Sequence, residues 1–285
     1  MKFSLVMSTL GRFEEVVEFI DSLQKLKHKD IELIIVDQNE EDKLQQMCSA
    51  LKVEFPFYFL RTPHEKGASR GRNTGISKAT GDVVCFPDDD CVYPPDLLNR
   101  VIEVFEKEKV DIVCGRASAP DGRSINGRFE TSAQSVDRKN VFTTQIEWTI
   151  FFKREVFDRV VGFDQNVGVG ASTPWQSCEG PDITLRALSA GYSVYYHPEV
   201  YAFHPELNIV TPDDAMIQKG RRYARGMGYV FKKHNYRFLY FSWYLVRPFG
   251  GALLALSKLR VQRARYYVQV IVGRLEGYYG ISFGK

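Results

Sequence analysis

Cysteine is scarce in this chain of 285 residues: the five cysteines form no CxxC pair and no metal-like spacing. We therefore expect free thiols in a reducing cytosol rather than a disulfide framework. No run of about 18 or more apolar residues is free of charge and proline, which excludes a polytopic membrane protein. The apolar run after Lys2 is too short for a signal peptide, so we expect none.

Two common phosphate-binding loops are also missing. No GxGxxG follows the first predicted strand, and GxxxxGK[ST] occurs nowhere in the chain. These absences argue against a dinucleotide-dependent oxidoreductase and against a P-loop NTPase. Internal repeats and low-complexity segments are absent as well.

The apolar content and the charge distribution are informative. Hydrophobic residues make up 44% of the chain, which is enough for a sizeable core, and mean hydropathy is −0.25. Residues 219–285 contain fourteen Lys and Arg and a single acid, Glu276, for a net charge of +13. The preceding 218 residues carry 24 basic and 34 acidic groups, a net −10. An acidic body is thus followed by a basic, aromatic tail.

Strand-like and helix-like segments alternate over the first 115 residues. Short apolar runs predict strands at 3–8, 31–36, 57–60, 83–86 and 110–114. Apolar residues at helical spacing, or a proline-marked start, predict helices at 13–26, 41–51, 69–79 and 94–108. This alternation predicts an α/β fold with a mostly parallel, Rossmann-like sheet and helices on both faces. Ligands bind such sheets beyond the carboxyl ends of the strands.

The middle of the chain is less regular. Residues 116–144 are rich in Gly, Ser, Asn and Arg and show no clear element. Beyond them we expect strands at 148–152, 192–196 and 200–203, and helices at 154–159 and 182–190.

Three acids, Asp88, Asp89 and Asp90, directly follow the predicted strand at 83–86. They could form a turn that caps the next helix. One cap needs only one carboxylate, however, and three adjacent acids repel one another unless a cation such as Mg²⁺ or Mn²⁺ binds them. The segment 66–75 places Arg70 and Arg72 at a helix start, where they could bind an anion or remain in a solvated loop.

These segments occur in the order and spacing of a known family. The shared motifs are Ser8-Thr9 with Arg12, Ile34-Ile35-Val36-Asp37, Gly71-Arg72-Asn73-x-Gly75, Asp88-x-Asp90, Gly162-Phe163-Asp164, Glu179-x-x-Asp182-Ile183-x-Leu185-Arg186 with Gly191, and His204. Over residues 3 to 206 the chain resembles the family 2 glycosyltransferases. The resemblance implies the GT-A fold and transfer of a sugar from a nucleotide-diphosphate donor. It also implies a divalent metal and, usually, inversion at the anomeric carbon.

The resemblance assigns roles residue by residue. The nucleotide-binding set that it implies is Ser8, Thr9, Arg12, Asp37, Arg72, Asp88 and Asp89. Within that set, Thr9 and Asp37 would lie around the base, and Arg72 would approach the diphosphate or ribose. Asp90, the second acid of the DXD motif, would ligate Mn²⁺ or Mg²⁺. His204 would complete the metal shell, with His197 as a competing candidate.

The catalytic base is expected at the start of the helix near residue 182. Many relatives carry two adjacent acids there, whereas this chain has Glu179-Gly180. Glu179 is the first candidate and Asp182 the second, although Asp182 could instead be a helix N-terminal charge. Trp148 and Trp175 could line the acceptor side, because flat apolar faces suit sugar rings, or could pack in the core.

The basic tail predicts a helix at 220–234, two amphipathic pieces within 238–257 separated at Arg247-Pro248 and Gly250-Gly251, and a further basic segment at 259–274. Its aromatic and basic residues suit the interface of an anionic membrane. Packing on the body or a homodimer contact are the alternatives. Its apolar density disfavours nucleic acid as a partner.

We therefore expect a GT-A catalytic domain at 1–210, with a nucleotide-binding half at 1–115 and an acceptor-binding half at 116–210, and a helical extension at 211–285. The expected function is metal-dependent, inverting transfer from a UDP-sugar to a glycan or lipid-linked acceptor in surface polysaccharide synthesis. The expected location is cytoplasmic, at the inner face of the cell membrane. Alternatives are a non-catalytic nucleotide-sugar or glycan-binding protein on the same fold, or a sugar nucleotidyltransferase.

Overall fold

The computed structural model describes residues 1–283 and contains two compact units. The first comprises residues 1–163 and 183–206, and the second comprises residues 164–182 and 207–283. The sequence placed 164–182 with the catalytic domain, whereas in the structure this segment clusters with the C-terminal helices.

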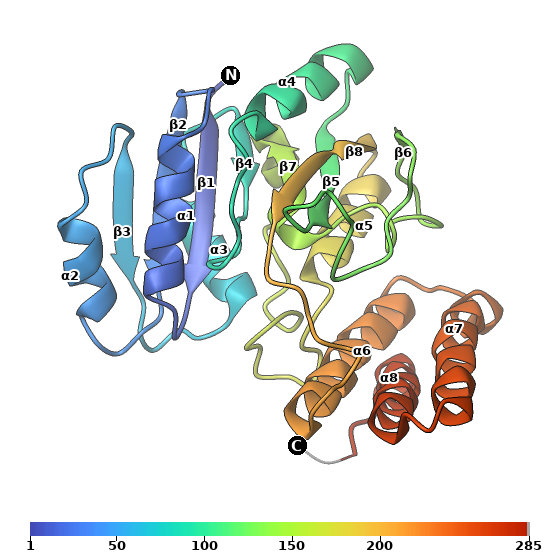
Figure 1. The fold of residues 1–285 in the computed structure, drawn as a ribbon. Coiled ribbons are helices and arrows are strands. Elements are labelled where there is room, and N and C mark those ends of the chain that lie inside the picture. Colours follow the sequence, from blue (N-terminus) through green and yellow to red (C-terminus); the bar gives the residue numbers. More distant parts are fainter. Residues whose placement is uncertain (284–285) are drawn as a thin grey trace. The chain divides into compact units, whose positions relative to one another are not determined.

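The first unit is built on one sheet in the order β3-β2-β1-β4-β7-β5-β8-β6 (Figure 1). Its strands are β1 (Phe3–Thr9), β2 (Ile31–Asp37), β3 (Phe57–Arg61), β4 (Val83–Cys85), β5 (Ile112–Ser118), β6 (Gln134–Ser135), β7 (Ile150–Lys153) and β8 (Val194–Phe203). Strands β7 and β6 pair antiparallel with their neighbours, and the other pairs are parallel. The mostly parallel α/β sheet expected from the sequence is confirmed.

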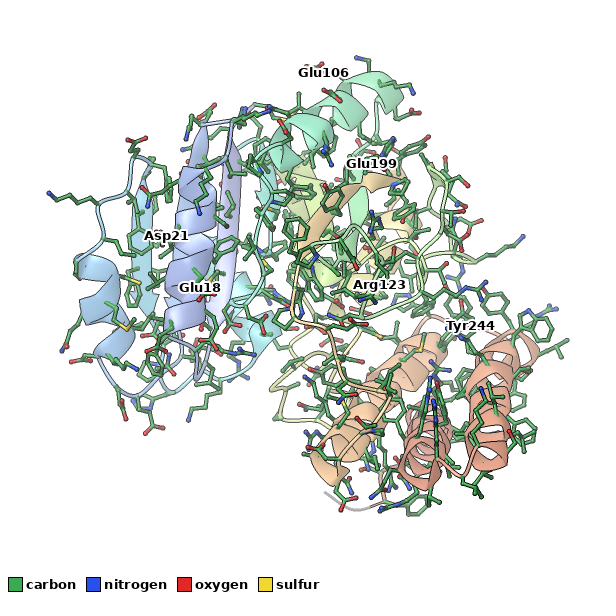
Figure 2. All side chains as sticks on the ribbon, in the orientation of Figure 1. Glu18, Asp21, Glu106, Arg123, Glu199 and Tyr244 are labelled. Carbon is green, nitrogen blue, oxygen red and sulfur yellow. The ribbon has the colours of Figure 1, made fainter. Side chains whose placement is uncertain are left out.

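Helices cover both faces of this sheet. They are α1 (Glu14–Gln24), α2 (Lys43–Ser49), α3 (Ala68–Ile76), α4 (Leu97–Glu108) and α5 (Glu179–Ser189), with 3-10 turns at Glu147–Thr149 and Arg154–Asp158. Helix α5 begins in the second unit and continues in the first. The exposed side of α1 carries Glu18 and Asp21, while its apolar residues are buried (Figure 2).

Alternate residues of β1 pack on opposite sides of the sheet, which fixes where α3 lies. Leu5 belongs to the core that α1 joins, while Val6 meets α3 at Gly75. A Cβ at Gly75 would lie 2.2 Å from Val6 Cγ1, and one at Gly71 would lie 2.1 Å from Ser8 Oγ. The two glycines of the Gly71-Arg72-Asn73-x-Gly75 motif thus let α3 approach β1 closely, and they hold Arg72 near the end of that strand.

Two expectations about the later strands are wrong in detail. The strands expected at 192–196 and 200–203 form one strand, β8, which contains Pro198. The proline is tolerated because the β5–β8 register shifts between Cys114 and Arg116, and Arg116 Nε donates to the Pro198 carbonyl at 2.8 Å. Trp148 lies in a 3-10 turn just before β7 rather than in the strand itself.

The second unit is mainly helical and contains α6 (Asp214–Lys233), α7 (Phe238–Ser257) and α8 (Val261–Tyr279). Helix α8 packs on both α6 and α7. Glycines allow the α6–α8 backbones to approach closely: a Cβ at Gly277 would lie 2.0 Å from the Arg225 carbonyl oxygen. Glu276, which is buried on α8, forms ion pairs with Arg221 and Arg225 of α6.

The break expected within 238–257 does not occur. Helix α7 runs through Pro248, which is buried, and Gly251 lies against the ring of Tyr267 on α8. Packing against α8 therefore outweighs the local cost of a proline inside a helix. Within residues 1–283, no helix combines the length and apolarity needed to cross a bilayer.

Candidate active site

The polar ends of the parallel strands meet at one edge of the sheet in the first unit. Thr9 at the end of β1 is in register with Asp37 at the end of β2, and Asp88–Asp90 follow β4, the other neighbour of β1. Thr9 Oγ1 donates to Asp89 Oδ2 at 2.7 Å. Strand ends that are distant in the sequence are thereby joined at the edge where the sequence predicted ligand binding.

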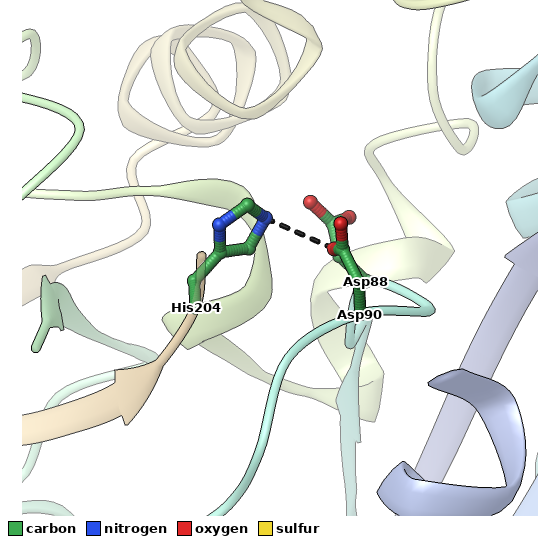
Figure 3. Close-up of side chains that lie close together, drawn as sticks. All are labelled: Asp88, Asp90 and His204. Carbon is green, nitrogen blue, oxygen red and sulfur yellow. Dashed lines mark ion pairs between the residues drawn. The ribbon is translucent and has the colours of Figure 1, made fainter. Parts of the chain in front are cut away.

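A short bridge brings the acidic loop to the end of β8. Val92 and Phe203 pair antiparallel, with N–O distances of 2.9 and 3.0 Å in the two directions. His204, the next residue, then points toward the carboxylates of Asp88 and Asp90 (Figure 3). Its Nε2 lies 3.0 Å from Asp90 Oδ1, and one ligand atom from each of the three residues lies within 4.8 Å of the others.

Two further residues hold the His204 ring. The indole of Trp148 stacks on it with ring centroids 4.3 Å apart and planes inclined by 16°. Asn126 Nδ2 lies 3.1 Å from Nδ1 of His204 and also donates to the Pro205 carbonyl. Nε2 is consequently the ring nitrogen directed at the acids.

The pKa values of Asp89 and Asp90 shift in opposite directions. Burial acts to raise the pKa of Asp90, but the hydrogen bond from His204 and the charges of His204 and Arg12 outweigh it and lower the pKa. Burial likewise acts to lower the pKa of His204, and its contact with Asp90 raises it instead. Burial raises the pKa of Asp89 to about 6, against the hydrogen bond from Thr9. Asp90 is thus held more firmly as a carboxylate than Asp89.

Two arginines balance the charge of the loop. Arg12 places a guanidinium nitrogen 2.7 Å from Asp90 Oδ2 and another 2.9 Å from Glu15 Oε1. Arg72, buried on α3, donates to Asp88 Oδ1 at 2.9 Å. Both arginines expected to approach the donor therefore lie beside the acids.

Asp37 is fully buried at the end of β2. Its Oδ1 accepts hydrogen bonds from the backbone and side chain of Asn39 at 2.9 and 2.8 Å. Its Oδ2 has no hydrogen-bond partner in residues 1–283, and the nearest cation, Arg61 Nε, lies 3.8 Å away. One carboxylate oxygen of Asp37 can thus accept a further hydrogen bond where the resemblance places the nucleobase.

The motif residue Asn73 connects α3 to the Gly162-Phe163 turn. Its Oδ1 accepts from the Phe163 amide at 2.7 Å, and its Nδ2 donates to the Phe163 carbonyl at 2.8 Å. Gly162 has φ +51°, and a Cβ there would lie 2.4 Å from Asn73 Oδ1. These contacts explain why asparagine and glycine stand at the two positions.

The two candidate bases lie in the second unit at the start of α5. Asp182 is fully buried, and its Oδ1 lies 2.7 Å from Lys233 Nζ and 2.8 Å from His234 Nε2. Lys233 also contacts Asp164 Oδ2 at 2.6 Å. Glu179 is buried as well, with 4% of its surface exposed. Asp182 is therefore committed to two cationic or hydrogen-bonding partners from the end of α6.

Sequence reasoning did not anticipate several of these contacts. Asn126 lies in the segment that showed no clear element, so no periodic signal marked it. Lys233 was predicted only as a basic residue of the tail, and His234 only as the end of the helix at 220–234.

His197 lies in the middle of β8, where its Nδ1 accepts a hydrogen bond from the Glu199 amide at 3.2 Å, and it is not part of the Asp88–Asp90–His204 cluster. In the second unit, Trp175 stacks on Tyr229 with centroids 4.7 Å apart.

Comparisons with known proteins agree with this architecture. The glycosyltransferase AglE of Haloferax volcanii is 22% identical over 233 residues, covering 78% of this chain and 72% of that protein. An uncharacterized glycosyltransferase of Nostoc is 28% identical and covers 94% of this chain and 83% of its own length.

Solved structures show the same fold. The mannosyltransferase PcManGT from Pyrobaculum calidifontis, in complex with GDP-Man and Mn²⁺, has a TM-score of 0.62 at 16% identity, covering 96% of this chain and 87% of its own. Residues 1–349 of S. aureus TarS, in complex with UDP-GlcNAc, have a TM-score of 0.53 at 16% identity, covering 100% and 93%.

The model of the family described as glycosyl transferase family 2 matches residues 4–160, more than half of the chain. The chain is therefore a glycosyltransferase of the nucleotide-sugar class, with the GT-A fold, and it belongs to glycosyl transferase family 2.

Proposed function

We propose that this enzyme is a metal-dependent, inverting transferase that moves a sugar from a nucleotide-diphosphate donor, with UDP favoured, to a hydroxyl of a glycan or lipid-linked acceptor. The observation that carries the proposal is the convergence of Asp88, Asp90 and His204 at one edge of the sheet. The proposed role of the enzyme is in the synthesis of a surface polysaccharide.

The residues at this edge fit a hard divalent cation. Two carboxylates and one imidazole can each offer a ligand atom, and Mn²⁺ accepts this mixture while Mg²⁺ favours the oxygens. Asp90 and His204 would hold the ion, and Asp88 would ligate it or its bound water. When bound there, the cation would supply Lewis-acid stabilisation of the charge that develops on the leaving nucleoside diphosphate. The solved structure of the mannosyltransferase PcManGT in complex with GDP-Man and Mn²⁺ supports the proposal of a divalent metal.

Donor binding would use the strand ends and the two arginines. Asp37 Oδ2, which lacks a hydrogen-bond partner in residues 1–283, would accept from an N–H of the base, with Ser8 and Thr9 beside it. Arg72 would contact the diphosphate or ribose, and Arg12 would exchange its contact with Asp90 for one to a phosphate. Asp89 accepts a hydrogen bond from Thr9 Oγ1, which ties the acidic loop to β1. Asp89 would thereby position both the loop and the end of this strand for the donor.

We propose Glu179 as the base that deprotonates the acceptor hydroxyl. Asp182 is the weaker candidate because it is fully buried and its Oδ1 is already engaged by Lys233 Nζ and His234 Nε2. Lys233 and His234 would then hold the first turn of α5 in place. Trp175, on its stacked partner Tyr229, remains the proposed platform for an acceptor sugar. Trp148, for which the sequence leaves both the acceptor side and the core open, is 6% exposed and stacks on His204, so we propose that it supports that ring.

A lipid-linked acceptor would bring the enzyme to a membrane surface. We propose that this association is peripheral, at the inner face of the cell membrane, and involves residues 219–285. The charge of this tail, +13, favours an anionic surface.

Release of nucleoside diphosphate from a panel of UDP-, GDP- and dTDP-sugars tests the function. With Mn²⁺ present, one nucleotide class should raise the melting temperature and also be cleaved. Stabilisation without any cleavage, with or without glycan acceptors, would instead identify a non-catalytic binding protein. Release of pyrophosphate from a nucleoside triphosphate and a sugar phosphate would identify a nucleotidyltransferase.

A further inference from the structure

Helix α7 is apolar on two opposite sides. One side is buried against the rest of the second unit through Phe241, Pro248, Ala252 and Ala255. The other side is open: Leu239 is 83% exposed and Trp243 is 74% exposed. A surface helix normally turns a polar face to water, so an apolar outer face needs another explanation.

The exposed apolar residues form one continuous stripe. They are Leu239, Trp243, Val246, Phe249, Leu253, Leu254 and Leu256, all more than half exposed. Steps of three, four, seven and eight residues place them on the same side of a helix. Leu259, in the turn between α7 and α8, and Val261, the first residue of α8, are also more than half exposed and continue the apolar sequence. We call these nine residues the α7 stripe.

Exposed basic residues lie at both ends of α7 and near its middle. Exposed Arg237 precedes α7, Arg247 lies near its middle, and Lys258 and Arg260 follow its last turn. No Asp or Glu occurs between Asp214 and Glu276 in the sequence. An apolar stripe accompanied by exposed cations with no intervening acid matches the interface of an anionic bilayer.

We propose that the α7 stripe is a membrane-docking surface that inserts into the headgroup region of an anionic bilayer, with α7 lying along the surface. The apolar side chains would enter the acyl boundary while Arg237, Arg247, Lys258 and Arg260 contact lipid phosphates. This inference rests on the peripheral membrane association proposed above and names the surface within residues 219–285 that makes it.

The charges favour a bilayer over a second copy of this chain. A two-fold dimer would place the α7 stripe against itself and bring the same basic residues of both copies together. With no acid between residues 214 and 276 to pair with them, these like charges would oppose association. A bilayer rich in anionic lipid neutralises them instead. Arg247 in the middle of α7 also argues for a helix on the surface rather than across the membrane.

Vesicle flotation of the full chain, without donor or metal, tests the inference. We expect binding to phosphatidylcholine vesicles containing phosphatidylglycerol, and binding at least tenfold weaker to phosphatidylcholine alone. The double variant Leu239→Glu, Leu253→Glu should weaken binding to the anionic vesicles at least tenfold. The matched control Tyr58→Glu, Val210→Glu introduces the same charge at exposed apolar positions outside α7 and should bind like the wild type.

Two further measurements make the outcome specific. Replacing Lys258 and Arg260 by Gln should weaken binding to anionic vesicles about 30-fold, since each basic residue contributes about fivefold. Brominated lipid should quench the fluorescence of Trp243, compared in wild type and Trp243→Phe. Equal binding by the α7 and control variants would overturn the proposal. So would a dimer, seen by sedimentation without lipid, that only the α7 variant abolishes. Because donor and metal are absent, failure here leaves the proposed catalytic site untouched.

Discussion

Nε2 of His204 lies 3.0 Å from Oδ1 of Asp90, although 114 residues separate them in the sequence. The bridge between Val92 and Phe203 makes this approach possible, and Trp148 and Asn126 hold the ring in its orientation. A histidine fixed in this way, with one nitrogen already engaged, offers the other to a metal.

His204→Ala should weaken Mn²⁺ binding about 10- to 100-fold, because it removes one proposed ligand and leaves the acids in place. His197→Ala, on the same strand β8, is the matched control and should bind Mn²⁺ like the wild type. The measurement is electron paramagnetic resonance of free Mn²⁺ in the presence of UDP. A loss of Mn²⁺ affinity in both variants, or in neither, would contradict the assignment of His204 as a metal ligand.

Glu179→Gln should reduce kcat at least 100-fold while leaving donor affinity within about twofold, because it removes only the proposed base. Asp182→Asn should act mainly on stability. It leaves Lys233 and His234 with a neutral partner, and we expect a loss of about 3 kcal/mol in the free energy of unfolding. Steady-state kinetics and urea unfolding separate the two effects. The assignment of Glu179 as the base would be wrong if a fully folded Asp182→Asn variant lost as much kcat as Glu179→Gln.

Asn73→Ala should destabilise the protein by about 2 kcal/mol, because the backbone N–H and C=O of Phe163 both lose their side-chain partner. Asn73→Asp keeps an acceptor for the N–H and loses the donor to the C=O, so its loss should be intermediate. Urea unfolding measures the series. Equal stability of all three proteins would show that this link between α3 and the turn contributes nothing.

Glu32 makes part of the stability depend on pH. Its carboxylate is buried, which acts to raise its pKa, but hydrogen bonds from Lys2, Ser4 and Thr80 lower the pKa from 4.5 to about 2. A depressed folded-state pKa stabilises the protein above the unfolded pKa, and the effect disappears as pH falls from about 4.5 to 2. We expect about 2 kcal/mol from this group at neutral pH. Glu32→Gln should therefore flatten the stability profile in that window, and an unchanged profile would refute this origin.

The order of strands and helices in the first unit could be predicted because local patterns and global fold agree there. Strands β1 and β2 are predominantly apolar and almost completely buried, and α1 has a clear apolar stripe. Pro198 and Pro248 misled the prediction. A register shift accommodates the first and packing on α8 the second, and neither effect is visible in a local window.

The residues of the candidate site likewise fall into those that the sequence could predict and those that it could not. Acids at strand ends could be found because parallel strands bring their carboxyl ends together. Asn126 and Lys233 could not, since each acts through a contact between segments distant in the sequence. The α7 stripe was only partly visible, because a helix apolar all round does not reveal which of its sides is buried.

The most direct test of the central claim is a calorimetric titration of Mn²⁺ into the enzyme with UDP, for wild type and Asp90→Asn. The account predicts one saturable Mn²⁺ site per chain in the wild type and an affinity at least tenfold lower in Asp90→Asn. Identical Mn²⁺ isotherms for the two proteins would contradict it.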